Sequence, residues 1–216
     1  MLFLLLGCAS GVLQFRDGSE PVRSAWYTKP SVNNADLTLV LVSNSDIYCD
    51  LPESEDPGEQ EAALVRQSAA FSREGTAIVL FLLYLDPDLS ALGSYEVTGD
   101  ASPTSLPFAE RGAPDLLAAF NGRAAGASWL TIREAAVEEE DGLAVSYEPG
   151  SSPGDVIYVP QVQGPGKVTV TGLENDTFAA TFQLDVVDVS GRFEAAYCGE
   201  DSDLYTSLSL TAGMGR

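Results

Sequence analysis

The sequence predicts a mainly-β protein, either an antiparallel β-sandwich or a flattened barrel of jelly-roll or immunoglobulin-like form, with one amphipathic helix near residues 59–73. Short runs rich in β-branched and aromatic residues recur between turn residues along most of the chain. Only one stretch has the spacing of a helix. Because no internal repeat or shift in composition divides the 216 residues, we expect a single folded domain over residues 25–216.

Two runs in the first half are apolar on both faces, which is typical of buried central strands. In residues 37–42 Leu alternates with Thr and Val, and residues 76–85 read TAIVLFLLYL. Between these runs the sequence changes to a helical spacing, which Gly75 ends. The helical stripe consists of Leu64, Val65, Ser68 and Phe71. We therefore expect the helix to pack its apolar side on the sheet.

The second half predicts short antiparallel strands. Residues 94–99 (SYEVTG) alternate, and residues 100–127 are rich in Pro, Ser, Gly and Ala, which favours a long loop. The stretch EEEDG at 138–142 separates two strand-like runs, as in a hairpin with an acidic tip. Further strand-like runs follow between residues 156 and 210, at the spacing of an antiparallel meander.

The composition excludes several classes of function. Lys and Arg total 11 against 32 Asp and Glu, so the net charge of −21 repels nucleic acid and anionic lipid surfaces. The chain has no histidine, which removes catalytic triads and metal sites that need one. We therefore expect a protein that is not an enzyme and needs no cofactor. A histidine-free hydrolase acting through carboxylates is an alternative.

Two of the three cysteines share one setting. Cys49 and Cys198 each follow a tyrosine at the end of a strand-like run. In an exported protein we expect two such cysteines to pair, which leaves Cys8 over. The bond would close a loop of about 150 residues and stabilise the fold by about 5 kcal/mol in the chain-entropy model. The alternative is a cytosolic protein with two buried free thiols.

Cys8 has different neighbours. The run Leu5-Leu6-Gly7-Cys8 resembles the lipobox of bacterial lipoproteins, which implies that Cys8 is acylated and holds the domain to a membrane. We expect residues 1–7 to be the remnant of a lipoprotein signal peptide and residues 8–24 to be the lipidated cysteine with a tether or an edge segment. No basic residue precedes Cys8, unlike in a complete signal peptide, so an ordinary N-terminal strand is the alternative.

Three parts of the chain together carry a family resemblance. They are Cys8 with its short tether, the run AWYTKP…LTLVLVSNSDIYC, and the closing run VSGRFEAAYC. This layout is similar to that of uncharacterised lipoproteins of GC-rich Gram-negative bacteria, notably myxobacteria-like lineages, in which an early strand ending in Cys and a terminal GxFxAxYC strand frame the domain. The resemblance implies an envelope location and a Cys49–Cys198 bridge, and no established activity comes with it.

Carboxylates near the two paired cysteines are candidate Ca²⁺ ligands. They are Asp46 and Asp50 beside Cys49, and Glu200, Asp201 and Asp203 after Cys198. A disulfide would bring the two groups together, and Ca²⁺ takes six to eight oxygen ligands. None of the spacings matches an EF-hand loop, so a solvated acidic rim is the alternative.

Aromatic residues are a second candidate site, because they would stack on sugar rings if they lined one face of the sheet. They are Trp26, Tyr27, Trp129, Tyr147 and Tyr158. Aromatic side chains at strand positions more often lie in the core or form cross-strand pairs, which is the alternative here.

These observations predict a lipid-anchored cell-envelope protein with a non-catalytic binding or structural role. Its partner is the outer membrane, which it contacts through Cys8 on the periplasmic or the surface side. The alternative is a carbohydrate- or Ca²⁺-dependent ligand-binding module of the same fold. The sequence specifies no protein or glycan partner.

Overall fold

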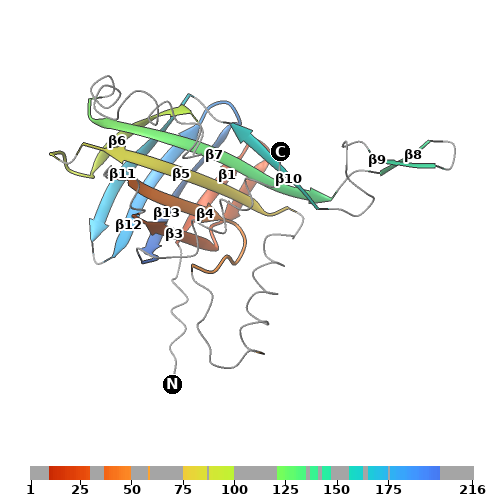
Figure 1. Cartoon of the computed structure of the whole chain (residues 1–216), viewed down its shortest axis with the longest axis horizontal. Helices are drawn as coiled ribbons and strands as arrows, with labels where there is room; N and C mark the ends of the chain where they lie inside the picture. The colour runs from red at the N-terminus through yellow and green to blue at the C-terminus, as the bar shows by residue number, and fades with distance from the viewer. Residues whose placement is uncertain are drawn as a thin grey trace.

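The computed structural model describes residues 10–29, 37–49, 58, 75–86, 88–99, 121–134, 137–140, 143–146, 156–162, 165–174 and 176–199. The strands in these ranges, drawn in Figure 1, are β1 (Ser10–Phe15), β2 (Gly18–Pro21), β3 (Ser24–Thr28), β4 (Leu37–Ser43), β5 (Ala77–Leu85), β6 (Gly93–Gly99), β7 (Arg123–Glu134), β8 (Val137–Glu140), β9 (Leu143–Ser146), β10 (Val156–Val162), β11 (Gly166–Glu174), β12 (Thr177–Leu184) and β13 (Val189–Tyr197). The helix expected at 59–73 lies outside the described residues.

Eight of these strands close into a barrel. Neighbours around the ring follow the order β12, β11, β6, β7, β5, β4, β3 and β13, and β13 pairs again with β12. The wall is extended by β1 and β2 next to β13 and by β10 next to β7. The mainly-β prediction is confirmed. Because one sheet closes on itself, the fold is the barrel of the two predicted forms. The two-sheet sandwich is not confirmed.

Two neighbouring pairs in the ring run parallel, although we predicted antiparallel strands throughout. The pairing of β13 with β3 joins Ala196 to Trp26 and Tyr197 to Tyr27, and β6 also runs parallel to β7. No tight turn links either pair, so nothing local forces the strands to be antiparallel. The meander β11–β12–β13 is antiparallel, as predicted.

The interior of the barrel is filled by aromatic and aliphatic side chains. Phe81, Phe178, Phe182 and Phe193 form a cluster in which ring centroids lie 5.0 to 6.2 Å apart. Along β12, buried side chains alternate with exposed or half-buried ones, because successive residues of a strand point to opposite faces. Aromatic rings bury more apolar area than other side chains, so this cluster supplies a large share of the core energy.

The outer surface of the barrel differs between its two sides. On β4 and β5 most outward side chains are apolar and buried, among them Leu39, Leu41, Ile78 and Leu82, each at most 4% exposed, whereas Leu80 is half-buried. Both strands are thus buried on both faces, which confirms the prediction of two central strands. On the opposite wall, β12 and β13 carry exposed polar side chains such as Thr181, Gln183 and Arg192. The sequence already shows this difference: apolar and polar residues alternate along β12, whereas β5 is apolar throughout.

The closing run GRFEAAYC owes its spacing to the barrel. Gly191, Phe193, Ala195 and Tyr197 occupy alternate positions of β13, so they share its inner face. A Cβ atom on Gly191 would lie 2.6 Å from the Val12 carbonyl oxygen and 2.7 Å from the Phe182 ring. Glycine is therefore required there, because β1 and an interior phenyl ring approach the strand closely.

The N-terminal residues that we expected to form a tether or an edge segment belong to the barrel wall. β1 pairs with β13 from Ser10 to Gln14, and β2 folds back on β1. Leu13 is fully buried and contributes to the core, which a free tether would not do. For residues 10–21 the edge segment is therefore the correct alternative.

A ribbon of strands extends away from the barrel (Figure 1). β7 begins at Arg123, inside the stretch predicted as a loop, because its small residues pack as a strand against β5. Its far end pairs with β10, from Ser128–Val162 to Glu134–Val156. Beyond it, β8 and β9 form a hairpin whose last pair is Glu140–Leu143, which confirms the hairpin predicted around EEEDG.

We expect Gly191→Ala to lower the free energy of unfolding by about 2 kcal/mol, because the new methyl group would meet backbone and a packed ring that cannot both move. Urea unfolding followed by circular dichroism measures the change. Gly18→Ala is the matched control, since a Cβ there meets nothing within 4 Å, and its effect should stay within about 0.5 kcal/mol. Equal effects of the two substitutions would contradict the role given to Gly191.

Stability should fall at alkaline pH because of two interior tyrosines. Burial raises the pKa of Tyr27 above its ordinary value, and Asp176 and Tyr197 raise it further. Burial also raises the pKa of Tyr95, against the opposing effect of Arg123. A tyrosine whose pKa is raised by folding makes its full contribution to stability below about pH 10, the pKa in the unfolded chain. That contribution is lost as the pH rises through the pKa in the folded protein. Urea unfolding at about pH 8 and about pH 11 should show a smaller loss for Tyr27→Phe than for the parent chain. An unchanged loss would contradict this.

Candidate functional site

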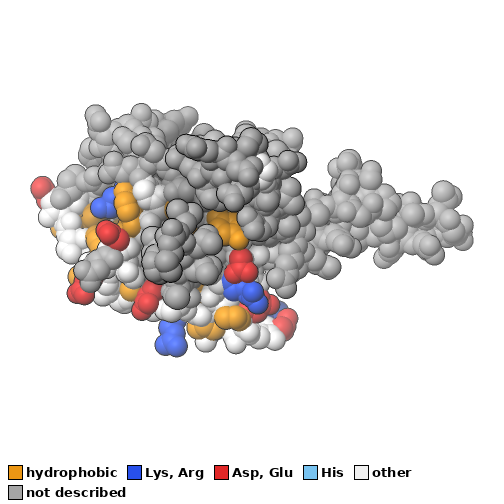
Figure 2. All heavy atoms as spheres, turned by 90° about the horizontal axis from the view of Figure 1, so that it is seen from below, with side chains coloured by type: hydrophobic (Ala, Val, Ile, Leu, Met, Phe, Trp, Pro, Cys, Tyr) orange, Lys and Arg blue, Asp and Glu red, His pale blue; other side chains and the backbone are white. Residues whose placement is uncertain are grey.

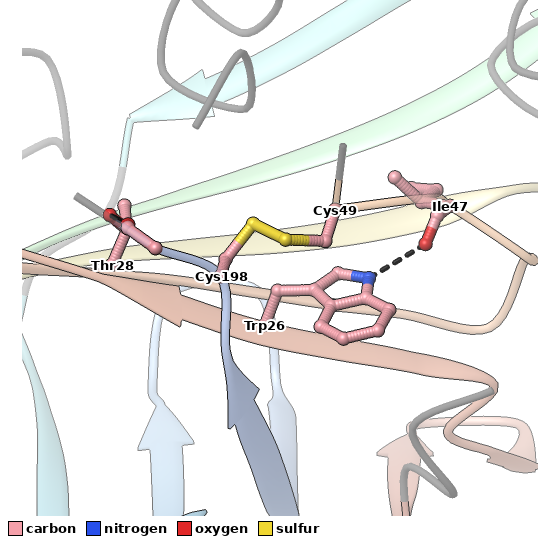
Figure 3. The surroundings of a disulfide bond; sticks show 6 residues. Trp26, Thr28, Ile47, Cys49 and Cys198 are labelled. Atoms are coloured by element: carbon pink, nitrogen blue, oxygen red, sulfur yellow. Dashed lines mark hydrogen bonds between the residues drawn. A yellow bond between two sulfur atoms is a disulfide. The ribbon is translucent and has the colours of Figure 1, made fainter. Parts of the chain in front are cut away.

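The residues around the predicted cysteine pair form a strap on the outside of the barrel. After β4 ends at Ser43, residues 44–49, here called the strap, turn back across β3. The Ile47 amide donates to Ser24 Oγ at 2.7 Å, and Trp26 Nε1 donates to the Ile47 carbonyl oxygen at 2.7 Å (Figure 3). These two bonds hold the middle of the strap against the outer face of β3.

The base of the strap is fixed by a network of polar side chains. The Ala77 amide donates to Asn44 Oδ1 at 2.7 Å, while Asn44 Nδ2 donates to the Gly75 carbonyl at 3.0 Å and to Glu20. Ser43 Oγ donates to the Ala77 carbonyl at 2.9 Å. Because buried polar groups are stable only when hydrogen-bonded, this network specifies where the strap begins.

The far end of the strap carries the disulfide. Cys49 and Cys198 are bonded, with Cα atoms 5.6 Å apart and a sequence separation of 149, which confirms the predicted pair. Cys198 is held in place by its amide, which donates to the Tyr27 carbonyl at 2.8 Å, and Thr28 donates its hydroxyl to the Gly199 carbonyl. In Figure 3 Trp26 lies beside the bond. Hydrogen bonds on both sides therefore bring the two sulfur atoms together.

The carboxylates proposed as Ca²⁺ ligands are only partly placed. Asp46 lies on the strap, is exposed and forms an ion pair with Arg23 at 3.5 Å. An exposed pair of this kind contributes little to stability. Asp50, Glu200, Asp201 and Asp203 lie outside the described residues. Among the residues that the structure describes, no three Asp, Glu, Cys or His side chains gather closely enough to hold a metal ion.

The aromatic residues proposed as a sugar face divide into different environments. Tyr27 points inward, with ring centroids 5.5 Å from Phe178 and 5.2 Å from Tyr197. Trp129 is 6% exposed and packs on Phe15 in the core. For these two the core alternative is correct. Trp26 is half-buried under the strap, Tyr147 lies outside the described residues, and Tyr158 is described only as part of β10.

One end of the barrel carries a turn that sequence reasoning missed. Residues 86–92 join β5 to β6, and Pro87 among them is not described. Leu89 is 37% exposed and Leu92 47% exposed, although most other residues of the turn are polar or small. Leu173, in the β11 end next to this turn, is 39% exposed. The sequence feature that points to this turn is the pair of leucines within DPDLSALGS, because a turn does not require leucine.

Arg123 holds this turn at its inner side. Arg123 Nη2 donates to the Ser90 carbonyl at 2.9 Å, and its guanidinium lies over Gly93, where a Cβ would be 3.1 Å from Nε. Nε itself is buried and has no hydrogen-bond partner. Next to it, Tyr95 Oη donates to the Ala91 carbonyl at 2.8 Å. Two side chains from the barrel thus fix the backbone of the turn.

No protein-family model, curated protein or solved structure matches this chain. The helices in the described part of the chain include none that is long and apolar enough to cross a bilayer.

We expect the double variant Cys49→Ala, Cys198→Ala to fold with a free energy of unfolding reduced by up to about 5 kcal/mol, because the loop that the bond closes is long. Urea unfolding without reductant measures the loss. Cys8→Ala is the control and should leave stability unchanged, since Cys8 is not in the bond. A double variant as stable as the parent would contradict a constraining role of the disulfide.

Proposed function

We propose that the protein is a lipid-anchored, non-catalytic component of a bacterial cell envelope, attached to the outer membrane through Cys8 and serving in binding or in structure. The observation that carries the proposal is the Cys49–Cys198 disulfide. Such bonds form and persist in oxidising compartments, among them the periplasm and the cell surface. The envelope location is thus supported by a bond in the fold as well as by a sequence pattern.

The pairing also distinguishes Cys8. With Cys49 and Cys198 bonded, Cys8 is the cysteine of the three that is left over, and it ends the lipobox-like run LLGC. Because β1 begins at Ser10, about 7 Å of chain at most separates Cys8 from the barrel wall. Acyl chains on Cys8 would therefore hold the barrel directly against the bilayer.

Two features support a role without catalysis. The chain has no histidine to activate a nucleophile. Buried hydroxyl groups in the described part serve the fold instead, since Ser24, Thr28 and Ser43 all hydrogen-bond to backbone atoms. The inward side chains form a packed core, so we place the binding of any partner on the outer surface, where acidic side chains are scattered (Figure 2).

Intact-mass measurement of the membrane fraction tests the proposal. We expect a chain that begins at an acylated Cys8 and gains two hydrogen atoms on reduction, as the Cys49–Cys198 bond opens. Cys8→Ser is the matched variant, which should appear in the soluble fraction with the disulfide intact. An unacylated chain that starts at Met1 and carries three free thiols would overturn both the anchor and the envelope location.

A further inference from the structure

We propose that the end of the barrel carrying Leu89, Leu92 and Leu173 rests on the lipid bilayer and inserts these side chains into its interfacial region. We call these three residues the apolar rim. The proposal rests on the lipid anchor proposed above and adds to it an orientation, a second contact and a lipid preference. Figure 2 shows apolar side chains exposed at the left end of the described surface, the end where the β5–β6 turn lies in Figure 1.

The start of β1, which follows the proposed anchor, and the apolar rim share one end of the barrel. Ser10 pairs with Glu194, Glu194 with Ala179, and Ala179 with Gly172. These four residues form one row across the sheet, which spans about 14 Å at the usual strand spacing. Leu173 follows Gly172 directly. The proposed anchor residue Cys8 is two positions before Ser10 in sequence, so the chain allows it at most about 7 Å from this end.

The two segments of the rim are neighbours as well. β11 and β6 pair up to Val170–Gly93; beyond this pair β6 is preceded by the β5–β6 turn, while β11 continues to Glu174 paired with β12. Leu92 directly precedes Gly93 and Leu173 lies three residues after Val170, so both leucines lie beyond the last β6–β11 pair. An acylated Cys8 would therefore bring this whole end to the membrane.

The exposure of the rim is built into the fold. The β5–β6 turn is held by the Asp86 amide, which donates to the Gly122 carbonyl at 2.9 Å, and by the bonds from Arg123 and Tyr95 to the turn backbone. Leu89 lies over Gly122, where a Cβ atom would collide with it. The turn is therefore fixed in a shape that leaves Leu92 in water, although exposing leucine to water is unfavourable.

The apolar rim exposes only a small apolar area. The exposed fractions of 37%, 47% and 39% together amount to little more than one whole leucine side chain. A stable protein interface buries about 800 Å² on each partner, far more than this rim offers. A contact that only supplements a lipid anchor needs no more, because the anchor already holds the rim at the bilayer.

The charges at this end determine which lipids fit. Asp88, Glu174 and Asp176 are exposed there, at the turns that carry the rim. Lys29 follows β3 at the same end and offsets them only in part. Like charges would repel an anionic surface, so the rim fits a zwitterionic one, where the apolar contact acts without that repulsion.

The test uses the full chain with its anchor replaced by a chemical one. Because Cys8 lies outside the disulfide, the unacylated chain is coupled through its thiol to maleimide-bearing phosphatidylethanolamine in vesicles of phosphatidylcholine with brominated acyl chains. Bromine quenches tryptophan that enters the interfacial region. Leu92→Trp probes the rim. Val186→Trp is the matched control, since Val186 is 59% exposed in the β12–β13 turn at the opposite end of the barrel.

We expect the tryptophan introduced at position 92 to lose about half of its fluorescence in brominated vesicles relative to unbrominated ones, because an interfacial side chain lies within a few ångströms of the acyl chains. The tryptophan at position 186 should lose none, beyond the background from Trp26 and Trp129. Replacing part of the phosphatidylcholine by phosphatidylglycerol at low salt should reduce quenching at position 92, and salt should restore it.

Equal quenching at the two positions, or stronger quenching at position 186, would overturn the inference. This result is independent of the anchor, because the coupling is chemical. A contrast between the two positions together with an unacylated Cys8 in cells would remove the proposed lipid anchor and leave the apolar rim as a membrane contact. An acylated Cys8 without the contrast would keep the anchor and remove the orientation.

Discussion

The structure depends on β13, because this late strand pairs with β1 and β3 from the start of the chain. It pairs with β12 along one edge, and with β1 and then β3 along the other. Its inward side chain Phe193 stacks within the aromatic cluster, and Cys198 follows it at once to form the disulfide. Pairing β13 with β1 and β3 closes long loops of the chain, which costs conformational entropy. The burial of the aromatic cluster offsets this cost. The ring, the core and the disulfide-bonded end of the strap therefore all depend on β13 and the cysteine that follows it.

The barrel separates packing from exposure in a way that bears on function. Its interior holds a packed core of aliphatic and aromatic side chains, so we place the binding of any partner on its outside. That outside is uneven: most outward side chains of β4 and β5 are buried, the leucines of the apolar rim are exposed, and the wall of β12 and β13 is polar. Of the large apolar side chains that are exposed in the described part of the chain, three gather in the apolar rim, while Val186 stands alone at the opposite end. Gathered apolar surface points to a contact, and we propose a bilayer as its partner.

Local periodicity accounts for the elements that were predicted correctly and for several that were not. The strands β4, β5 and β12 follow from their apolar patterns, and the β8–β9 hairpin from its acidic turn. The polar residues 10–21 resembled a tether, because their pairing partner on β13 lies at the far end of the sequence. Tyr27 and Trp129 were candidates for a sugar face, since a strand pattern does not tell which face closes inward. Of the five proposed Ca²⁺ ligands, Asp46 alone is described, in an ion pair with Arg23.

The sequence by itself determined the mainly-β class, the strands buried on both faces and the two cysteines that pair, because these depend on residue type and on spacing along one strand. Only the tertiary structure decided that the sheet closes into a barrel, that Gly191 lies between β1 and Phe182, and that the apolar rim shares an end with the start of β1. These features are set by the hydrogen-bond register between residues as distant in sequence as Ser10 and Glu194, and no local pattern carries that register.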